Sequence, residues 1–156
     1  MDSATELDGL KAALAAPRDR TPDGGRMPQF RWAKGADGLW LFPASMQDTG
    51  GMRFMAAQSG WPVGRVEDAD RLAFWVATAA RQDLWRSLKG VPGLVPVIRV
   101  SVDAAAGHLR MLVGAMVPPQ RVSPAVETVL RDLIRPAKAE AWTGWARTKL
   151  AEAPGT

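Results

Sequence analysis

The stretch from residue 97 to residue 117 constrains the fold more than any other part of the chain. Over 97–103 apolar residues alternate with polar ones, which is the period of a strand with one buried face. A turn containing Gly107 follows, and apolar residues then recur at alternate positions over 109–117. The two stretches predict a β-hairpin whose apolar face other elements must cover.

The region before this hairpin is also strand-like. Residues 30–34 and 39–42 flank a Gly-Ala-Asp-Gly turn, whose residues tolerate the backbone angles of a tight hairpin. A third strand is expected over 52–57, after a second glycine-rich turn. The three successive strands predict a βββ meander.

Helical patterns precede, separate and follow the strands. They are expected at about 4–16, at 67–89, from Pro124 to a break at Pro136, and at 137–151. The second helix has acidic residues in its first turn and basic residues in its last, which complements the helix dipole. Ser123 is expected to cap the third. The order α-βββ-α-ββ-αα predicts an α+β fold, a mainly antiparallel sheet of about five strands with helices packed on it.

The length and composition are those of one globular domain, with 47% hydrophobic and 23% charged residues in 156. We therefore expect a single domain over 1–156. Residues 17–29 are rich in Pro, Asp and Gly, which predicts a mobile loop or linker after the first helix. Ser3 followed by Glu6 fits a capping box at the start of that helix.

The chain is poor in reactive side chains, with no Cys, no Tyr and a single His, His108. The absence of Cys excludes a disulfide framework and thiolate zinc sites. Most catalysis at neutral pH needs an imidazole, a thiolate or a metal, and no phosphate loop, dinucleotide fingerprint or nucleophile elbow occurs. We expect a protein that is not an enzyme and that uses no metal and no cofactor. An enzyme built on paired carboxylates, such as Asp48 and Asp103, stays as a further hypothesis.

The first residues are acidic and polar, and no stretch approaches ~18 uninterrupted apolar residues. We therefore expect no signal peptide, no membrane span and a cytoplasmic protein. Arg far outnumbers Lys and Asn is absent, which is typical of GC-rich bacterial coding. The net charge of +4 is spread along the chain without a polybasic run.

Tryptophan and basic residues recur four positions apart in the expected helices. The pairs are Arg71–Trp75, Arg81–Trp85, Trp85–Lys89, Lys138–Trp142 and Trp145–Lys149. Residues at this spacing share a helix face, so a cationic group can lie over an indole ring. Either the basic stems cover the edge of the core, or the pairs form an exposed contact surface.

The first hypothesis for function is a non-catalytic bacterial interaction module, such as an accessory subunit, adaptor or inhibitor, with a protein partner. Its contact residues are expected to be Trp142, Trp145, Lys138 and Lys149. The apolar side of the last helix is otherwise mostly Ala, so the two indoles are expected to be partly exposed, as contact sites often are. The oligomeric state is left open.

The alternative hypothesis is a nucleic-acid-binding accessory protein with a basic sheet face. Five basic residues fall in the expected strands or their turns: Arg31, Lys34, Arg53, Arg99 and Arg110. Phosphate contacts from such a face predict binding that weakens as salt is added.

Overall fold

The computed structural model of the protein describes residues 3–16 and 29–152. Its elements, in chain order, are α1 (Ser3–Ala15), β1 (Phe30–Gly35), β2 (Gly38–Pro43), β3 (Arg53–Pro62), α2 (Ala69–Leu88), β4 (Val95–Asp103), β5 (His108–Val117), the short 3-10 helix η1 (Pro119–Arg121), α3 (Pro124–Leu133) and α4 (Pro136–Leu150). This order confirms the predicted α+β fold. Residues 17–28 of the predicted loop lie outside the described residues.

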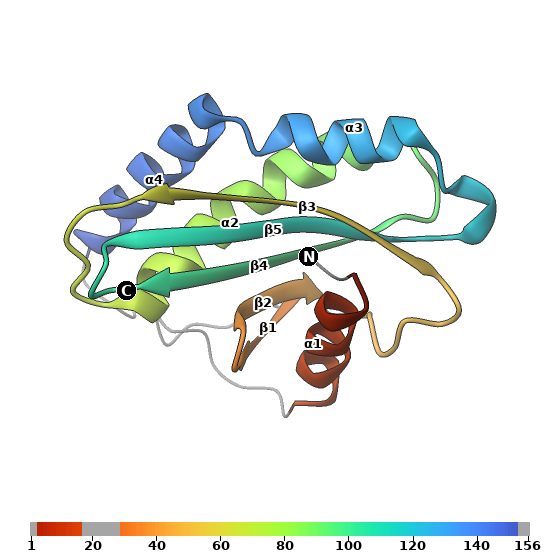
Figure 1. Ribbon diagram of the computed structural model, residues 1–156, viewed down its shortest axis with the longest axis horizontal. Helices are drawn as coiled ribbons and strands as arrows, with labels where there is room; N and C mark the ends of the chain where they lie inside the picture. Colours follow the sequence, from red (N-terminus) through yellow and green to blue (C-terminus); the bar gives the residue numbers. More distant parts are fainter. Residues whose placement is uncertain (1–2, 17–28, 153–156) are drawn as a thin grey trace.

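The strands form one antiparallel sheet in the order β1-β2-β4-β5-β3 (Figure 1). In one detail the sheet departs from a meander, because β3 does not pair with β2 but lies at the opposite edge beside β5. The ten residues of β3 pair with β5 along their whole length, whereas β2 has only six residues. The connection over 44–52 carries the chain across the sheet.

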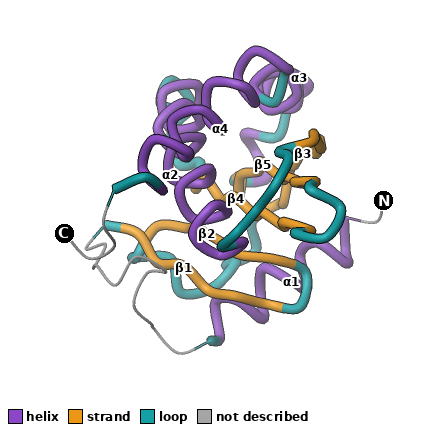
Figure 2. The backbone as a smooth tube through the Cα atoms, turned by 90° about the vertical axis from the view of Figure 1, so that its left-hand side faces the viewer, coloured by secondary structure: helices purple, strands orange, loops and turns teal. Residues whose placement is uncertain are grey.

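Helices cover both faces of the sheet, with α2, α3 and α4 on one side and α1 on the other (Figure 2). The larger core lies under α2, where Leu72, Ala80 and Leu84 are fully buried. A smaller core lies under α1, where Leu10 packs with Trp40. Because successive strand residues face opposite ways and both faces are covered, the centre of β2 is buried on each side.

The helix ends follow the local chemistry that the sequence indicated. The Asp68 side chain accepts a hydrogen bond from the Arg71 backbone N–H (3.1 Å) at the start of α2. The predicted Ser123 cap is confirmed, since its hydroxyl accepts from the Val126 N–H (3.4 Å). Pro136 begins α4 just after α3 has ended, which is the expected break. The capping side chain of Ser3 lies outside the described part of the molecule.

Candidate interaction site

A groove with a volume of about 690 Å³ opens between the end of β3 and the part of α4 from Pro136 to Arg147. Four consecutive residues of β3, from Ser59 to Pro62, form one of its walls. Gly60 has no side chain, so at this position the wall of the groove is backbone. The groove therefore lies directly beside the backbone of β3, which is an edge strand of the sheet.

The opposite wall of the groove combines small and apolar residues with two charged ones, Glu140 and Arg147. Ala139, Thr143 and Gly144 line it from α4, and Ile134 and Pro136 line it from the junction with α3. A Cβ atom added to Gly144 would meet no atom within 4 Å. The small side chains of α4 are thus the reason that this space is not filled from within.

Two polar contacts hold the end of β3 against α4. The Trp61 indole N–H donates to the Thr143 hydroxyl (2.9 Å), which in turn donates to the Ala139 carbonyl (2.8 Å). The Arg147 guanidinium donates to the carbonyl oxygens of Val63 and Arg65. Because both contacts span the groove, its two walls are fixed relative to one another.

β3 is an edge strand of the sheet. Within residues 3–16 and 29–152 it pairs with β5 along its whole length, and no other strand lies beside it. Its only charged residue is Arg53, at its start, whereas the other edge strand, β1, has Arg31 and Lys34 within six residues. Charged side chains are a common protection of sheet edges against pairing, so β3 is the less protected edge.

The structure does not support the predicted exposure of Trp142. This residue is only 3% exposed and lies in the larger core. Its indole N–H donates to the Asp83 carboxylate of α2 (2.8 Å), and Lys138 pairs with the same carboxylate (3.3 Å). The indole can be buried because Asp83 satisfies its polar atom, so these two residues fasten α4 to α2.

Trp145 and Lys149 do lie together at the surface. Trp145 is 39% exposed, and the Lys149 ammonium lies 5.5 Å from its ring centroid and 5.7 Å from that of Trp75. The Trp75 and Trp145 rings meet edge to face at 5.5 Å. Trp145, Lys149 and Trp75 therefore form a small cluster. This cluster lies on the side of α4 away from the groove.

The other predicted Trp and basic pairs have different outcomes. Lys89 lies 5.9 Å from the Trp85 ring centroid as expected, and Trp85 is 54% exposed. Arg81 instead lies over the Phe30 ring, at 4.0 Å from its centroid. Burial lowers the pKa of the Arg81 guanidinium from its ordinary value. Arg81 of α2 therefore contacts an aromatic ring of the sheet, Phe30 of β1, and not Trp85 of its own helix.

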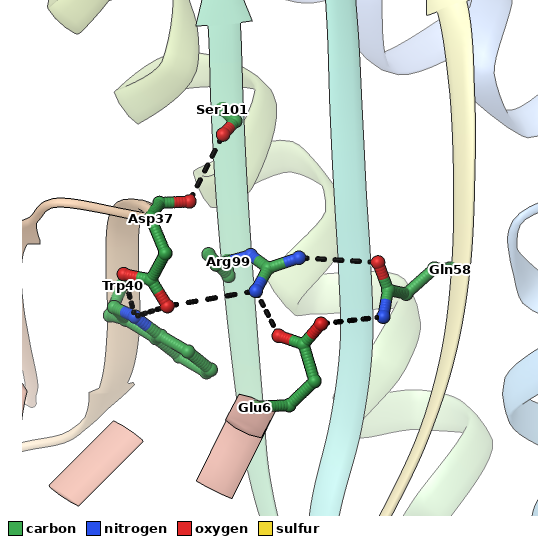
Figure 3. A network of polar contacts seen from close by, with 6 residues as sticks. All are labelled: Glu6, Asp37, Trp40, Gln58, Arg99 and Ser101. Atoms are coloured by element: carbon green, nitrogen blue, oxygen red, sulfur yellow. Dashed lines mark hydrogen bonds and ion pairs between the residues drawn. The ribbon is translucent and has the colours of Figure 1, made fainter. Parts of the chain in front are cut away.

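Arg99 is buried, which corrects its expected role as an exposed nucleic-acid contact. Its guanidinium forms an ion pair with Glu6 of α1 and donates to the Gln58 side chain (3.2 Å), with Asp37 at 3.6 Å (Figure 3). Gln58 donates back to Glu6 (3.0 Å), and Asp37 accepts from the Trp40 indole. Glu6 is therefore turned into the interior, where it attaches α1 to the sheet.

The other four predicted basic contacts are not gathered on one open face. Arg31 donates to the Leu14 and Ala16 carbonyl oxygens at the end of α1. Lys34 forms an ion pair with Asp70 of α2 (2.9 Å) on the other side of the sheet. Arg53 and Arg110 are both exposed but belong to the start of β3 and of β5, at opposite ends of that strand pair.

Sequence reasoning missed the groove residues because the third strand was expected to end at residue 57. Gly60 and Pro62 are typical strand breakers, but an edge strand tolerates them. The run without charge after Arg53 was visible in the sequence, yet it indicates an open edge only once the sheet order is known.

Among residues 3–16 and 29–152, no group of three or more His, Asp or Glu side chains is placed to hold a metal ion. No helix in that part of the chain is both long enough and apolar enough to cross a membrane. The sequence and structure match no protein-family model, no curated protein and no solved structure.

Proposed function

We propose that this protein is a non-catalytic interaction module that binds an extended segment of a partner protein at the groove between β3 and α4. The observation that carries the proposal is the free edge of β3 directly beside an apolar cavity. An adaptor, an accessory subunit or an inhibitor would each use such a site. The bacterial and cytoplasmic setting is part of the proposal and rests on the amino-acid sequence alone.

Binding of this kind adds a strand to the sheet. Backbone groups of the segment pair with the outer edge of β3, and alternate side chains enter the groove. The backbone pairing supplies affinity, while the groove selects which side chains are accepted. Its volume of about 690 Å³ lies within the range of cavities that bind ligands in proteins, roughly 300–1,000 Å³.

A second copy of the same chain fits this edge less well than a different segment does. In a symmetric antiparallel pairing of two β3 strands, Arg53 of one copy lies opposite Pro62 of the other. Arg147 is attached next to that end of β3, through the Val63 carbonyl, so two positive charges approach one another. Like charges at an interface are unfavourable, and the proposal therefore commits to a partner protein.

The test is to fill the groove without disturbing the fold. We expect Gly144→Trp to place an indole in the cavity, because an added Cβ meets no neighbouring atom, and to abolish the enrichment of extended segments from a displayed library of short peptides. The matched control is Ala141→Trp, at an exposed position of the same helix. Enrichment that is equal for the two variants, at unchanged melting temperatures, would contradict the proposed site. A concentration-dependent dimer in size-exclusion chromatography that Gly144→Trp abolishes would instead identify a second copy as the occupant.

A further inference from the structure

We infer that the bound segment carries an acidic side chain near the Arg147 end of the groove and a basic side chain near the Glu140 end, with an apolar residue between them. This inference rests on the proposed function and names the class of segment that the groove selects. It is argued from the placement of charge along α4.

The groove has one negative and one positive residue on its α4 wall, Glu140 and Arg147. They are seven residues apart, which is two helical turns and about 10 Å along the axis, so they lie on the same side of the helix. The wall between them is made by Thr143 and Gly144, which are uncharged. The groove is therefore polarised along its length.

The direction of this polarity relative to β3 follows from two contacts. Trp61 meets Thr143, and Val63 meets Arg147, so α4 and β3 advance in the same direction. The positive residue consequently lies at the end of β3, and Glu140 lies toward the middle of the strand.

Both charges are available to a ligand. Glu140 is exposed, and its side chain makes no ion pair or hydrogen bond with another residue of the described segments. Arg147 donates to two backbone carbonyl oxygens, but those partners are neutral. No carboxylate within residues 3–16 and 29–152 forms an ion pair with it. Glu67 and Asp68 line a neighbouring cavity together with Arg147 but form no ion pair with it, so its charge is held in place by neutral partners.

The spacing and order of the ligand charges follow from the sheet. All strand pairs of the sheet are antiparallel, so an added strand is expected to run opposite to β3 and to begin at the Arg147 end. Side chains that face α4 recur every second residue, about 6.7 Å apart. Positions one and five of such a strand are about 13 Å apart, which is about 3 Å more than the axial distance between Glu140 and Arg147. The long side chains of Glu140 and Arg147 can bridge this difference, so we expect an acid, an apolar residue and a base at positions one, three and five.

The experiment uses the full chain and a displayed library of short peptides in which these three positions are randomised. We expect the wild-type protein to enrich acid–apolar–base peptides over the charge-swapped order by about threefold to tenfold, as two partly exposed ion pairs predict. Glu140→Lys is expected to reverse the preference at the fifth position from basic to acidic. The matched control is Asp8→Lys, which makes the same change of charge at an exposed site of α1, on the other face of the sheet; it should leave the preference unchanged.

The outcomes separate this inference from the proposed function. The inference would be overturned if extended peptides were enriched without any dependence on charge order. It would also be overturned if Glu140→Lys preferred the same charge order as the wild type. Either result would leave the proposed strand-binding site unaffected. Failure to enrich any peptide would overturn the proposed function and the inference with it. Reversal at the fifth position in Glu140→Lys but not in Asp8→Lys supports both.

Discussion

At the scale of single residues, two tryptophans three positions apart in α4 have opposite environments. Trp142 is 3% exposed, and its indole N–H donates a hydrogen bond to Asp83. Trp145 is 39% exposed, and its ring meets the Trp75 ring edge to face. The helix repeat alone places both on one side of α4. The position of α2 decides which of them is covered.

This difference predicts unequal effects of truncation. Trp142→Ala is expected to lower the free energy of unfolding by about 3–5 kcal/mol, because it removes a large core side chain and leaves Asp83 without its indole donor. Trp145→Ala is expected to cost about 1 kcal/mol or less, as is usual for surface residues. Urea denaturation of the two variants measures both values. Equal losses would show that the two side chains are covered alike.

At the scale of elements, α1 is attached to the sheet by a small apolar core and by the polar network of Glu6, Arg99 and Gln58 (Figure 3). A Cβ added at Gly9 would overlap the Asp37 carboxylate, so a larger residue there would displace that side chain from its contacts with Trp40 and Arg99. A buried ion pair adds little net stability compared with apolar residues of the same size, but breaking it leaves an uncompensated charge. The network therefore sets where α1 docks more than how tightly it docks.

The expected signature is a non-additive pair of substitutions. Glu6→Leu alone is expected to lower the free energy of unfolding by about 3 kcal/mol, because Arg99 stays buried without its closest carboxylate. Adding Arg99→Met is expected to recover part of that loss. Guanidinium denaturation of the single and double variants tests this. A double variant that is less stable than Glu6→Leu would mean that the Arg99 charge is compensated by Asp37 and Gln58 alone.

At the scale of the whole molecule, the described helices cover both faces of the sheet, with α2, α3 and α4 on one face and α1 on the other (Figure 2). Arg99 is buried under α1, Arg31 is bonded to the end of α1, and Lys34 is paired with Asp70. These three side chains are therefore engaged in contacts within the protein and do not form an exposed basic sheet face. The mode of recognition that we propose uses the edge of β3 instead of a sheet face.

We accordingly expect no specific binding of single-stranded or duplex oligonucleotides. Fluorescence anisotropy of labelled oligonucleotides should show no saturable change, and no dependence on salt between about 50 and 200 mM, because few phosphates can be neutralised at once. A steep salt dependence that Arg53→Ala or Arg110→Ala weakens would revive the nucleic-acid hypothesis.

The sequence alone determined the number, order and approximate bounds of the elements, together with features such as the Ser123 cap and the break at Pro136. These depend on hydrophobic period, turn residues and capping, which act between residues close in the chain. The expected end of the third strand was wrong, because the breakers Gly60 and Pro62 are tolerated at an edge.

Only the tertiary structure decided which strand is the open edge, which tryptophan is buried and where the groove lies. The free edge of β3 follows from its pairing with β5, and the burial of Trp142 follows from Asp83 on another helix. The groove needs Gly144 and Trp61, which are far apart in the sequence, to face one another. Such features depend on contacts between distant segments, and the local periodicity of one segment carries no information about what packs against it.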